Sequence, residues 1–160
     1  MPIKLKQTES QLQQQCVKWF RLHPKFRNYN GHDLAGHLFS IPNGGKRSAV
    51  TGAIMKREGA LPGVADLFLM KCNAYYNGLF VEMKVGKNNQ QPSQKDFEQN
   101  CQWAGYKYAV CRSLDEFIKT ITDYLNDKNY CLSEYYATGR TAQASISYHG
   151  RPKWCLPGLS

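Results

Sequence analysis

Residues 62–94 decide the fold, and they read PGVADLFLM, KCNAYYNG, LFVEMKV and GKNNQQPSQ in four consecutive segments. The first and third segments contain apolar runs of strand length, and turn-forming residues bound them. Asp66 opens the first run, and Glu82 and Lys84 interrupt the second. Because an unpaired charge inside an apolar strand is costly to bury, chemistry is the best reason for these residues to be there.

The arrangement of these charges depends on how the two strands pair. Side chains alternate between the faces of a strand, so Glu82 and Lys84 share one face and Met83 points to the other. The Asn-Gly dipeptide that ends the spacer is typical of a two-residue hairpin, but such a hairpin would leave Asp66 far from Glu82. We therefore predict that residues 71–78 form a wide loop and that Asp66 lies opposite Met83, beside Glu82 and Lys84.

Two converging carboxylates favour a metal ion between them, because they otherwise repel one another. Oxygen ligands select a hard ion, so Mg²⁺ or Mn²⁺ is expected rather than zinc. Such an ion activates water for attack on a phosphodiester, and Lys84 would orient that water or stabilise the growing charge. The alternative is that Glu82 and Lys84 form an ion pair on a half-exposed sheet. The apolar run that follows Asp66 favours the metal site.

Regular elements are predicted on both sides of this stretch. Thr8 and Gln11 form a capping box that begins a helix at Glu9, and Pro24 ends it, with residues 25–37 as a loop. Glu9 by itself is best explained as a first-turn acid favoured by the helix dipole. The whole pattern predicts an α/β fold whose central mixed sheet is flanked by helices. The other predicted elements are a strand at residues 38–41, a helix at 48–58, a helix after Ser93 with Asp96 at its capping-box position, a strand at 106–111 and a helix after Ser113.

The charge balance favours a polyanionic partner. The chain of 160 residues has 21 Lys and Arg against 12 Asp and Glu, a formal net charge of +9, although a merely soluble basic protein would show the same balance. The turn that begins at Asn43 and continues to Lys46 and Arg47 is equally a phosphate-binding turn or a solvated loop. Lys56 and Lys87 are further candidate phosphate contacts.

Cysteine usage and hydropathy bear on the cellular setting. None of the six cysteines forms a CxxC pair and the four histidines complete no zinc-ligand spacing, so we do not expect structural zinc. Several cysteines occupy apolar positions, which suits a reducing cytosol. There is no apolar run of signal-peptide or membrane-helix length, and we expect a cytoplasmic protein without a membrane partner.

An Asp that opens one strand, followed by Glu-x-Lys in the next, resembles the PD-(D/E)xK nuclease superfamily. A longer match is similar to the virus-type replication-repair nuclease (VRR-NUC) family and covers residues 8–125. It is carried by the segments NGGKRS (43–48), EGALPGVADLFL (58–69), GLFVEMKVGKNNQQPSQKDF (78–97) and AGYKYAVCRSLDEFIKTITDYL (104–125). The resemblance implies a restriction-endonuclease-like core.

The resemblance also implies roles for individual residues. Gln94 taken alone would more often be a solvated first-turn residue, so its role rests on the resemblance. One departure is Ala65, where the family usually has proline; this change leaves every implied ligand in place. The implied site has Asp66, Glu82 and the backbone carbonyl of Met83 as metal ligands, Lys84 as the catalytic lysine, Gln94 pointing into the site and Glu9 approaching the metal.

The function implied is that of a metal-dependent, structure-specific DNA endonuclease. The chain resembles short stand-alone viral and bacterial members that look like Holliday junction resolving enzymes, which act as homodimers on branched DNA. We expect a nuclease domain over residues 1–125 and an extension over residues 126–160 that packs on this domain or on a dimer partner. Alternatives are an exonuclease or restriction-type nuclease of the same superfamily and a catalytically silent basic module that binds DNA or RNA.

Overall fold

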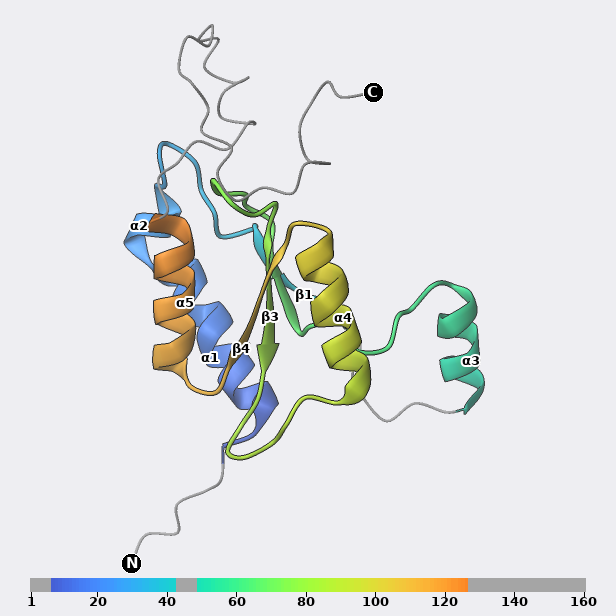
Figure 1. The fold of residues 1–160 in the computed structure, drawn as a ribbon. Coiled ribbons are helices and arrows are strands. Elements are labelled where there is room, and N and C mark those ends of the chain that lie inside the picture. The colour runs from blue at the N-terminus through green and yellow to red at the C-terminus, as the bar shows by residue number, and fades with distance from the viewer. Residues whose placement is uncertain (1–6, 43–48, 127–160) are drawn as a thin grey trace, which may run out of the picture.

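A computed structural model describes residues 7–42 and 49–126, and their elements alternate in the predicted order (Figure 1). The α/β class with a mixed sheet is confirmed. The turn with Asn43, Lys46 and Arg47 lies outside the described residues, as do residues 127–160 of the predicted extension. The elements are α1 (Glu9–Leu22), α2 (Pro24–Arg27), β1 (Leu38–Ser40), α3 (Ala49–Arg57), β2 (Leu67–Leu69), β3 (Leu79–Met83), α4 (Pro92–Trp103), β4 (Lys107–Cys111) and α5 (Leu114–Asn126).

The short helix α2 corrects the prediction that residues 25–37 form a loop throughout. Pro24 ends α1, as predicted, but it also begins α2. A proline is well suited to the first turn of a helix, because its fixed φ is helical and its missing N–H would have no partner there. Phe26 in this helix is buried in the core, which holds the turn in place.

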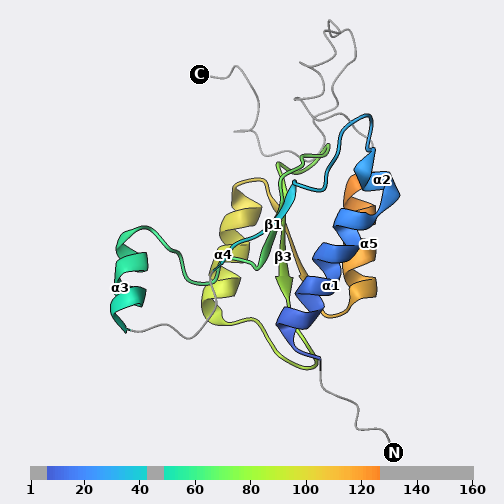
Figure 2. The same ribbon diagram turned by 180° about the vertical axis from the view of Figure 1, so that it is seen from behind.

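The sheet has the order β1-β2-β3-β4, with β1, β2 and β3 antiparallel and β4 parallel to β3. Helices α1 and α5 cover one face and α4 covers the other (Figures 1 and 2). No helix of the described residues has the length and apolar character needed to cross a membrane. The face toward α1 and α5 contains the main core, which includes Leu12, Cys16, Phe20, Leu69, Leu79, Val81, Met83, Phe117, Ile121 and Tyr124.

The pairing of β2 with β3 differs by one residue from the predicted register. Leu69 pairs with Leu79, and the same register carried one residue beyond the ladder sets Asp66 level with Glu82 rather than with Met83. Residues opposite one another in an antiparallel pair share a face, so a one-residue slip moves a side chain to the other face. The observed register therefore brings Asp66 to the face of Glu82, whereas the predicted one would have put it on the core face.

The loop at residues 70–78 is wide, as predicted, and a buried asparagine holds it. The side-chain Oδ1 of Asn73 accepts hydrogen bonds from the backbone N–H groups of Tyr75 and Tyr76, both at 2.9 Å. Its amide nitrogen donates to the backbone carbonyl of Tyr124 in α5 at 3.1 Å, and the Tyr124 hydroxyl donates to the Lys71 carbonyl at 2.6 Å. These bonds to α5 replace the tight Asn-Gly hairpin.

The chain segment that leads to Asp66 passes close to the start of α4 at Gly63. This glycine has a φ of +84°, and a Cβ there would lie 2.2 Å from the backbone oxygen of Ser93. A side chain at this position therefore clashes with backbone as well as straining its own φ. Gly59 has a φ of +92°, but a Cβ there would meet nothing within 4 Å.

This difference predicts that Gly63→Ala destabilises the fold more than Gly59→Ala does. Gly59→Ala pays only for the left-handed φ, about 1–2 kcal/mol in free energy of unfolding. Gly63→Ala adds the overpacking against Ser93, about 1–3 kcal/mol more. Urea unfolding followed by circular dichroism measures both losses. Equal losses in the two variants would contradict the close approach of Gly63 to α4.

Candidate active site

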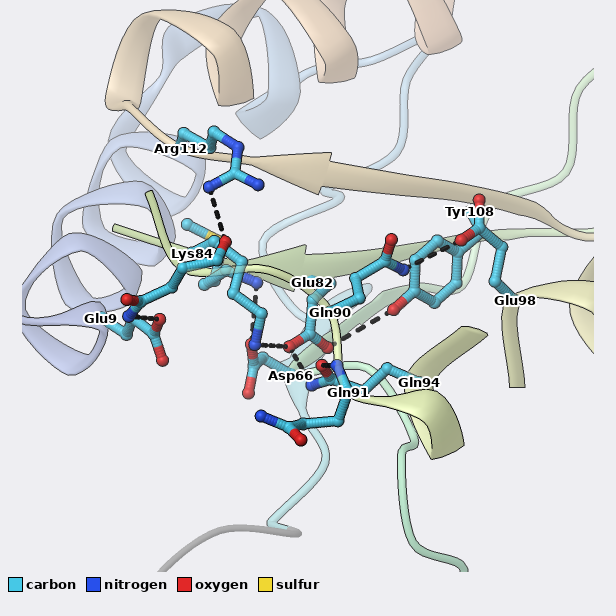
Figure 3. Close-up of polar contacts among 12 residues, drawn as sticks. Glu9, Asp66, Glu82, Lys84, Gln90, Gln91, Gln94, Glu98, Tyr108 and Arg112 are labelled. Carbon is cyan, nitrogen blue, oxygen red and sulfur yellow. Dashed lines mark hydrogen bonds and ion pairs between the residues drawn. The ribbon is translucent and has the colours of Figure 1, made fainter. Parts of the chain in front are cut away.

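Three charged side chains meet on the face of the sheet that α4 covers (Figure 3). Asp66 immediately precedes β2, Glu82 lies in β3 and Lys84 follows β3. The Lys84 ammonium lies 2.8 Å from Oε1 of Glu82, and this ion pair is buried, with Glu82 2% and Lys84 7% exposed. The Asp66 Oδ2 atom accepts a hydrogen bond from the backbone N–H of Met83 at 2.8 Å. The structure thus brings Asp66, Glu82 and Lys84 together.

Gln94 joins this cluster from the first turn of α4. Its Nε2 donates to Oε1 of Glu82, and its Oε1 accepts from the backbone N–H of Gln91 at 2.8 Å. The capping box of α4 is therefore formed by Gln91 and Gln94, which corrects the predicted box of Ser93 and Asp96. Because the cap fixes one end of the Gln94 amide, the other end is aimed at the carboxylate.

Tyr108 in β4 is a neighbour that the sequence analysis missed. Its hydroxyl lies 3.5 Å from Oε2 of Glu82, and burial first and the Glu82 charge second raise the pKa of this hydroxyl. Tyr108 pairs with Phe80, two residues before Glu82, so alternation along β3 puts it on the face of Glu82. Alternation along β4 indicates which residues share a face with Tyr108, but only the parallel pairing with β3 shows that this face carries Glu82.

Glu9 approaches the site from the start of α1. Its Oε1 accepts a hydrogen bond from Nδ2 of Asn88 at 3.1 Å. Asn88 lies in the loop between β3 and α4, and so does the exposed Lys87. Lys56 lies elsewhere, in α3, which stands away from the sheet beyond α4 in both views (Figures 1 and 2). Lys87 is thus next in sequence to the residue that contacts Glu9, whereas Lys56 lies on a separate helix.

The carboxylates of the site are electrostatically strained. Burial is the main cause that raises the pKa of Asp66, and the Met83 N–H and the Lys84 charge oppose it. Burial likewise raises the pKa of Glu82 against the hydrogen bond from Lys84, and the Asp66 charge adds to the increase. The Glu9 charge raises both pKa values further. Lys84 therefore compensates this negative charge only in part.

The donor chemistry fits a hard divalent cation. Two desolvated carboxylates with raised pKa values lie side by side, and a cation between them would relieve both. Residues 7–42 and 49–126 contain no cluster of three or more His, Cys, Asp or Glu side chains arranged to hold a metal ion. Asp66 and Glu82 are the carboxylates that would supply side-chain ligands to such an ion; these roles and that of the Met83 carbonyl stay predictions.

A mixed sheet that carries an Asp beside a Glu-x-Lys pair defines a nuclease-type domain. The model of the VRR-NUC domain family matches residues 7–115, and the chain belongs to this family. A solved structure described as a VRR_NUC domain protein superposes with a TM-score of 0.66 at 24% identity, over 79% of this chain and 94% of that chain. At that identity the likeness shows the fold. No curated protein matches the chain.

The strain at Asp66 predicts that Asp66→Asn stabilises the metal-free protein at neutral pH. The folded-state pKa of Asp66 is raised, so its favourable contribution exists below the unfolded value of about 3.9 and is lost as the pH rises through the folded value. An asparagine keeps an acceptor for the Met83 N–H without the charge. The variant should unfold at a higher temperature than the wild type at pH 7 in EDTA, and the gain should shrink as the pH falls toward 4.

Thermal unfolding followed by circular dichroism over a pH series measures this gain. The matched control is Asp123→Asn, because Asp123 is exposed and pairs with Lys119 on the surface of α5. This control should leave the unfolding temperature unchanged or lower it slightly. A lower unfolding temperature for Asp66→Asn at pH 7 would show that the Asp66 charge stabilises the fold.

Proposed function

We propose that this protein is a divalent-metal-dependent DNA endonuclease that hydrolyses phosphodiester bonds in branched DNA such as Holliday junctions. The observation that supports it most directly is the meeting of Asp66, Glu82 and Lys84 on one face of the sheet, with Lys84 and Glu82 buried as a pair. Natural proteins seldom bury such a pair for stability, because desolvation can exceed the Coulombic gain. A catalytic role accounts for keeping it.

The residues divide the chemistry between them. Mg²⁺ or Mn²⁺ held by Asp66, Glu82 and the Met83 carbonyl would polarise the phosphate and lower the pKa of a bound water. The Lys84 ammonium has three donors, one of which is engaged by Glu82, so the others can orient the attacking water or stabilise charge on the phosphate. Gln94 holds the Glu82 carboxylate in one orientation, because both ends of its own amide are fixed.

The positive charge of the chain would hold the DNA. Lys87 is exposed in the loop after β3, and Lys56 is exposed on α3. With Asn43, Lys46 and Arg47 in the turn before α3, they form a set of candidate phosphate contacts. Such contacts position a duplex without reading its sequence.

The homodimer and the branched substrate extend the proposal beyond one active site. Short stand-alone members of the family, which this chain resembles, are expected to place two active sites on a branched duplex. The nuclease domain would comprise residues 1–125, with the extension over residues 126–160 packing on it or on the second copy. We place this activity in the cytoplasm, in a bacterial or viral (phage) context, where DNA repair intermediates supply the substrate.

The proposed function predicts that Lys84→Ala abolishes cleavage while DNA binding survives. Loss of a charge-stabilising donor should lower the rate by about 10²–10³-fold. The assay incubates four-way junctions, flaps and linear duplex with Mg²⁺ and maps the products on each strand. Binding is followed by fluorescence anisotropy in Ca²⁺. Lys84→Met controls for lost volume and should be equally inactive, whereas Lys119→Ala removes an exposed cation from α5 and should keep full activity.

The outcomes separate the proposal from its alternatives. Internal cuts in four-way junctions faster than in linear duplex support it. Release of nucleotides from ends would instead indicate an exonuclease, and equal cutting of linear duplex a restriction-type enzyme. Binding without any Mg²⁺- or Mn²⁺-dependent cleavage by the wild type would indicate a silent module. Full activity of Lys84→Ala would refute the assignment of the catalytic lysine.

A second prediction concerns salt. If Lys87 contacts a phosphate, Lys87→Ala should weaken binding to all DNA sequences alike and reduce the slope of log affinity against log salt by about one unit. Fluorescence anisotropy over a range of salt concentrations measures the slope. Lys119→Ala serves again as the matched control and should leave the slope unchanged. An unchanged slope in Lys87→Ala would remove Lys87 from the phosphate contacts.

A further inference from the structure

The loop between β3 and α4 is gripped by an arginine from the end of β4. Arg112, labelled in Figure 3, follows the last residue of this strand. Its Nη1 donates to the backbone carbonyls of Gly86 at 3.1 Å and Asn88 at 2.8 Å. Its backbone N–H donates in turn to the Glu116 side chain in α5 at 2.7 Å. Arg112 is therefore anchored to α5 through its backbone and to the loop through its guanidinium.

The two carbonyls define the conformation of the loop. Gly86 has a φ of +58°, and the Asn88 N–H donates to the Val85 carbonyl at 3.3 Å, so the chain turns sharply here. Because one nitrogen of Arg112 bonds both Gly86 and Asn88, it fixes the turn between them.

This grip is continued toward the active site by Asn88. With its backbone held by Arg112, the Asn88 side chain donates from Nδ2 to Oε1 of Glu9 at 3.1 Å. In the close-up the Glu9 side chain lies on the side of the site where Lys84 and Asp66 are (Figure 3). A chain of hydrogen bonds thus runs from α5 through Arg112 and the loop to Glu9 at the edge of the site.

We propose that Arg112 is a positioning residue for the metal site: by holding the carbonyls of Gly86 and Asn88 it aims Asn88, and through Asn88 the Glu9 carboxylate, at the ion that Asp66 and Glu82 would bind. The inference rests on the proposed metal site and adds a residue to it. Partners of this kind orient ligands, and their loss typically weakens metal binding by about 10–100-fold.

A purely electrostatic role for Arg112 predicts the opposite sign. As a bare positive charge near the site it would repel a divalent cation, so its removal would tighten metal binding. As a positioning residue it favours binding, so its removal weakens it. Arg112→Lys separates the two further, because lysine keeps the charge but its ammonium is one bond nearer to the backbone than Nη1, so it does not reach both carbonyls.

The first experiment is calorimetric titration of Mn²⁺ into the full-length protein and its variants. Arg112→Ala and Arg112→Lys should each bind Mn²⁺ about 10-fold more weakly than the wild type. The matched control is Arg27→Ala, which removes an exposed arginine that pairs with Asp33. Arg27 lies in α2, beyond the end of α1 that is opposite to Glu9, so its loss should leave the affinity unchanged. Tighter binding by Arg112→Ala, or unchanged binding by Arg112→Lys, would overturn the proposal.

A double-mutant cycle tests whether the effect passes through Glu9. In a Glu9→Gln background the carboxylate that Arg112 positions is absent, so adding Arg112→Ala should change the Mn²⁺ affinity by less than about twofold. A further loss as large as the one seen in the wild-type background would show that Arg112 acts by another route.

Hydrogen exchange tests the grip without metal. In the metal-free protein the Asn88 amide, bonded to the Val85 carbonyl, and the Gln91 amide, bonded to the Gln94 side chain at the start of α4, should exchange several-fold faster in both Arg112 variants. Their exchange should be unchanged in Arg27→Ala. Unchanged exchange in the Arg112 variants would refute the positioning role. Failure of the wild type to bind Mn²⁺ would refute the proposed metal site instead, so the two failures are distinguishable.

Discussion

The pairing of β2 with β3 is the constraint on which the active site depends. Side chains repeat every two residues along a strand, so only one register in two puts Asp66 on the face of Glu82. No tight turn sets this register. The wide loop between the strands sets it instead, and that loop is tied through Asn73 to the backbone of Tyr124 in α5. A helix on the core face thus determines which carboxylates meet on the other face.

The two faces of the sheet affect the free energy of unfolding in opposite directions. The core face buries apolar residues of α1, α5 and the strands, which stabilises the fold. The face toward α4 buries the ion pair of Glu82 and Lys84 beside Asp66, and desolvation makes these charges unfavourable. The fold tolerates the second term because the first is larger and because α4 supplies Gln94 as a hydrogen-bond donor. In the proposed function, a cation bound between Asp66 and Glu82 would relieve this unfavourable charge.

Local signals carried most of the fold and part of the site. The capping box of Thr8 and Gln11 and the cap at Ser113 predicted where α1 and α5 begin, because each cap depends only on residues within one turn. The register of Asp66 was wrong by one residue, because loop length and distant anchoring decide it. Tyr108 and Arg112 could not be assigned from the sequence, because their partners, in β3 and in the loop after it, lie more than twenty positions away. Only the parallel pairing of β3 with β4 brings them together.

That parallel pairing also brings two cations to the same end of the sheet. Met83 pairs with Cys111, so Lys84 and Arg112 follow the last pair of the β3 and β4 ladder. Both could compete for the Glu82 carboxylate. Their hydrogen bonds divide the acceptors instead: Lys84 takes the carboxylate, and Arg112 takes two uncharged carbonyls of the next loop. Because the two carbonyls satisfy Arg112, it does not neutralise Glu82, and the negative charge on this face would stay available to the proposed metal ion.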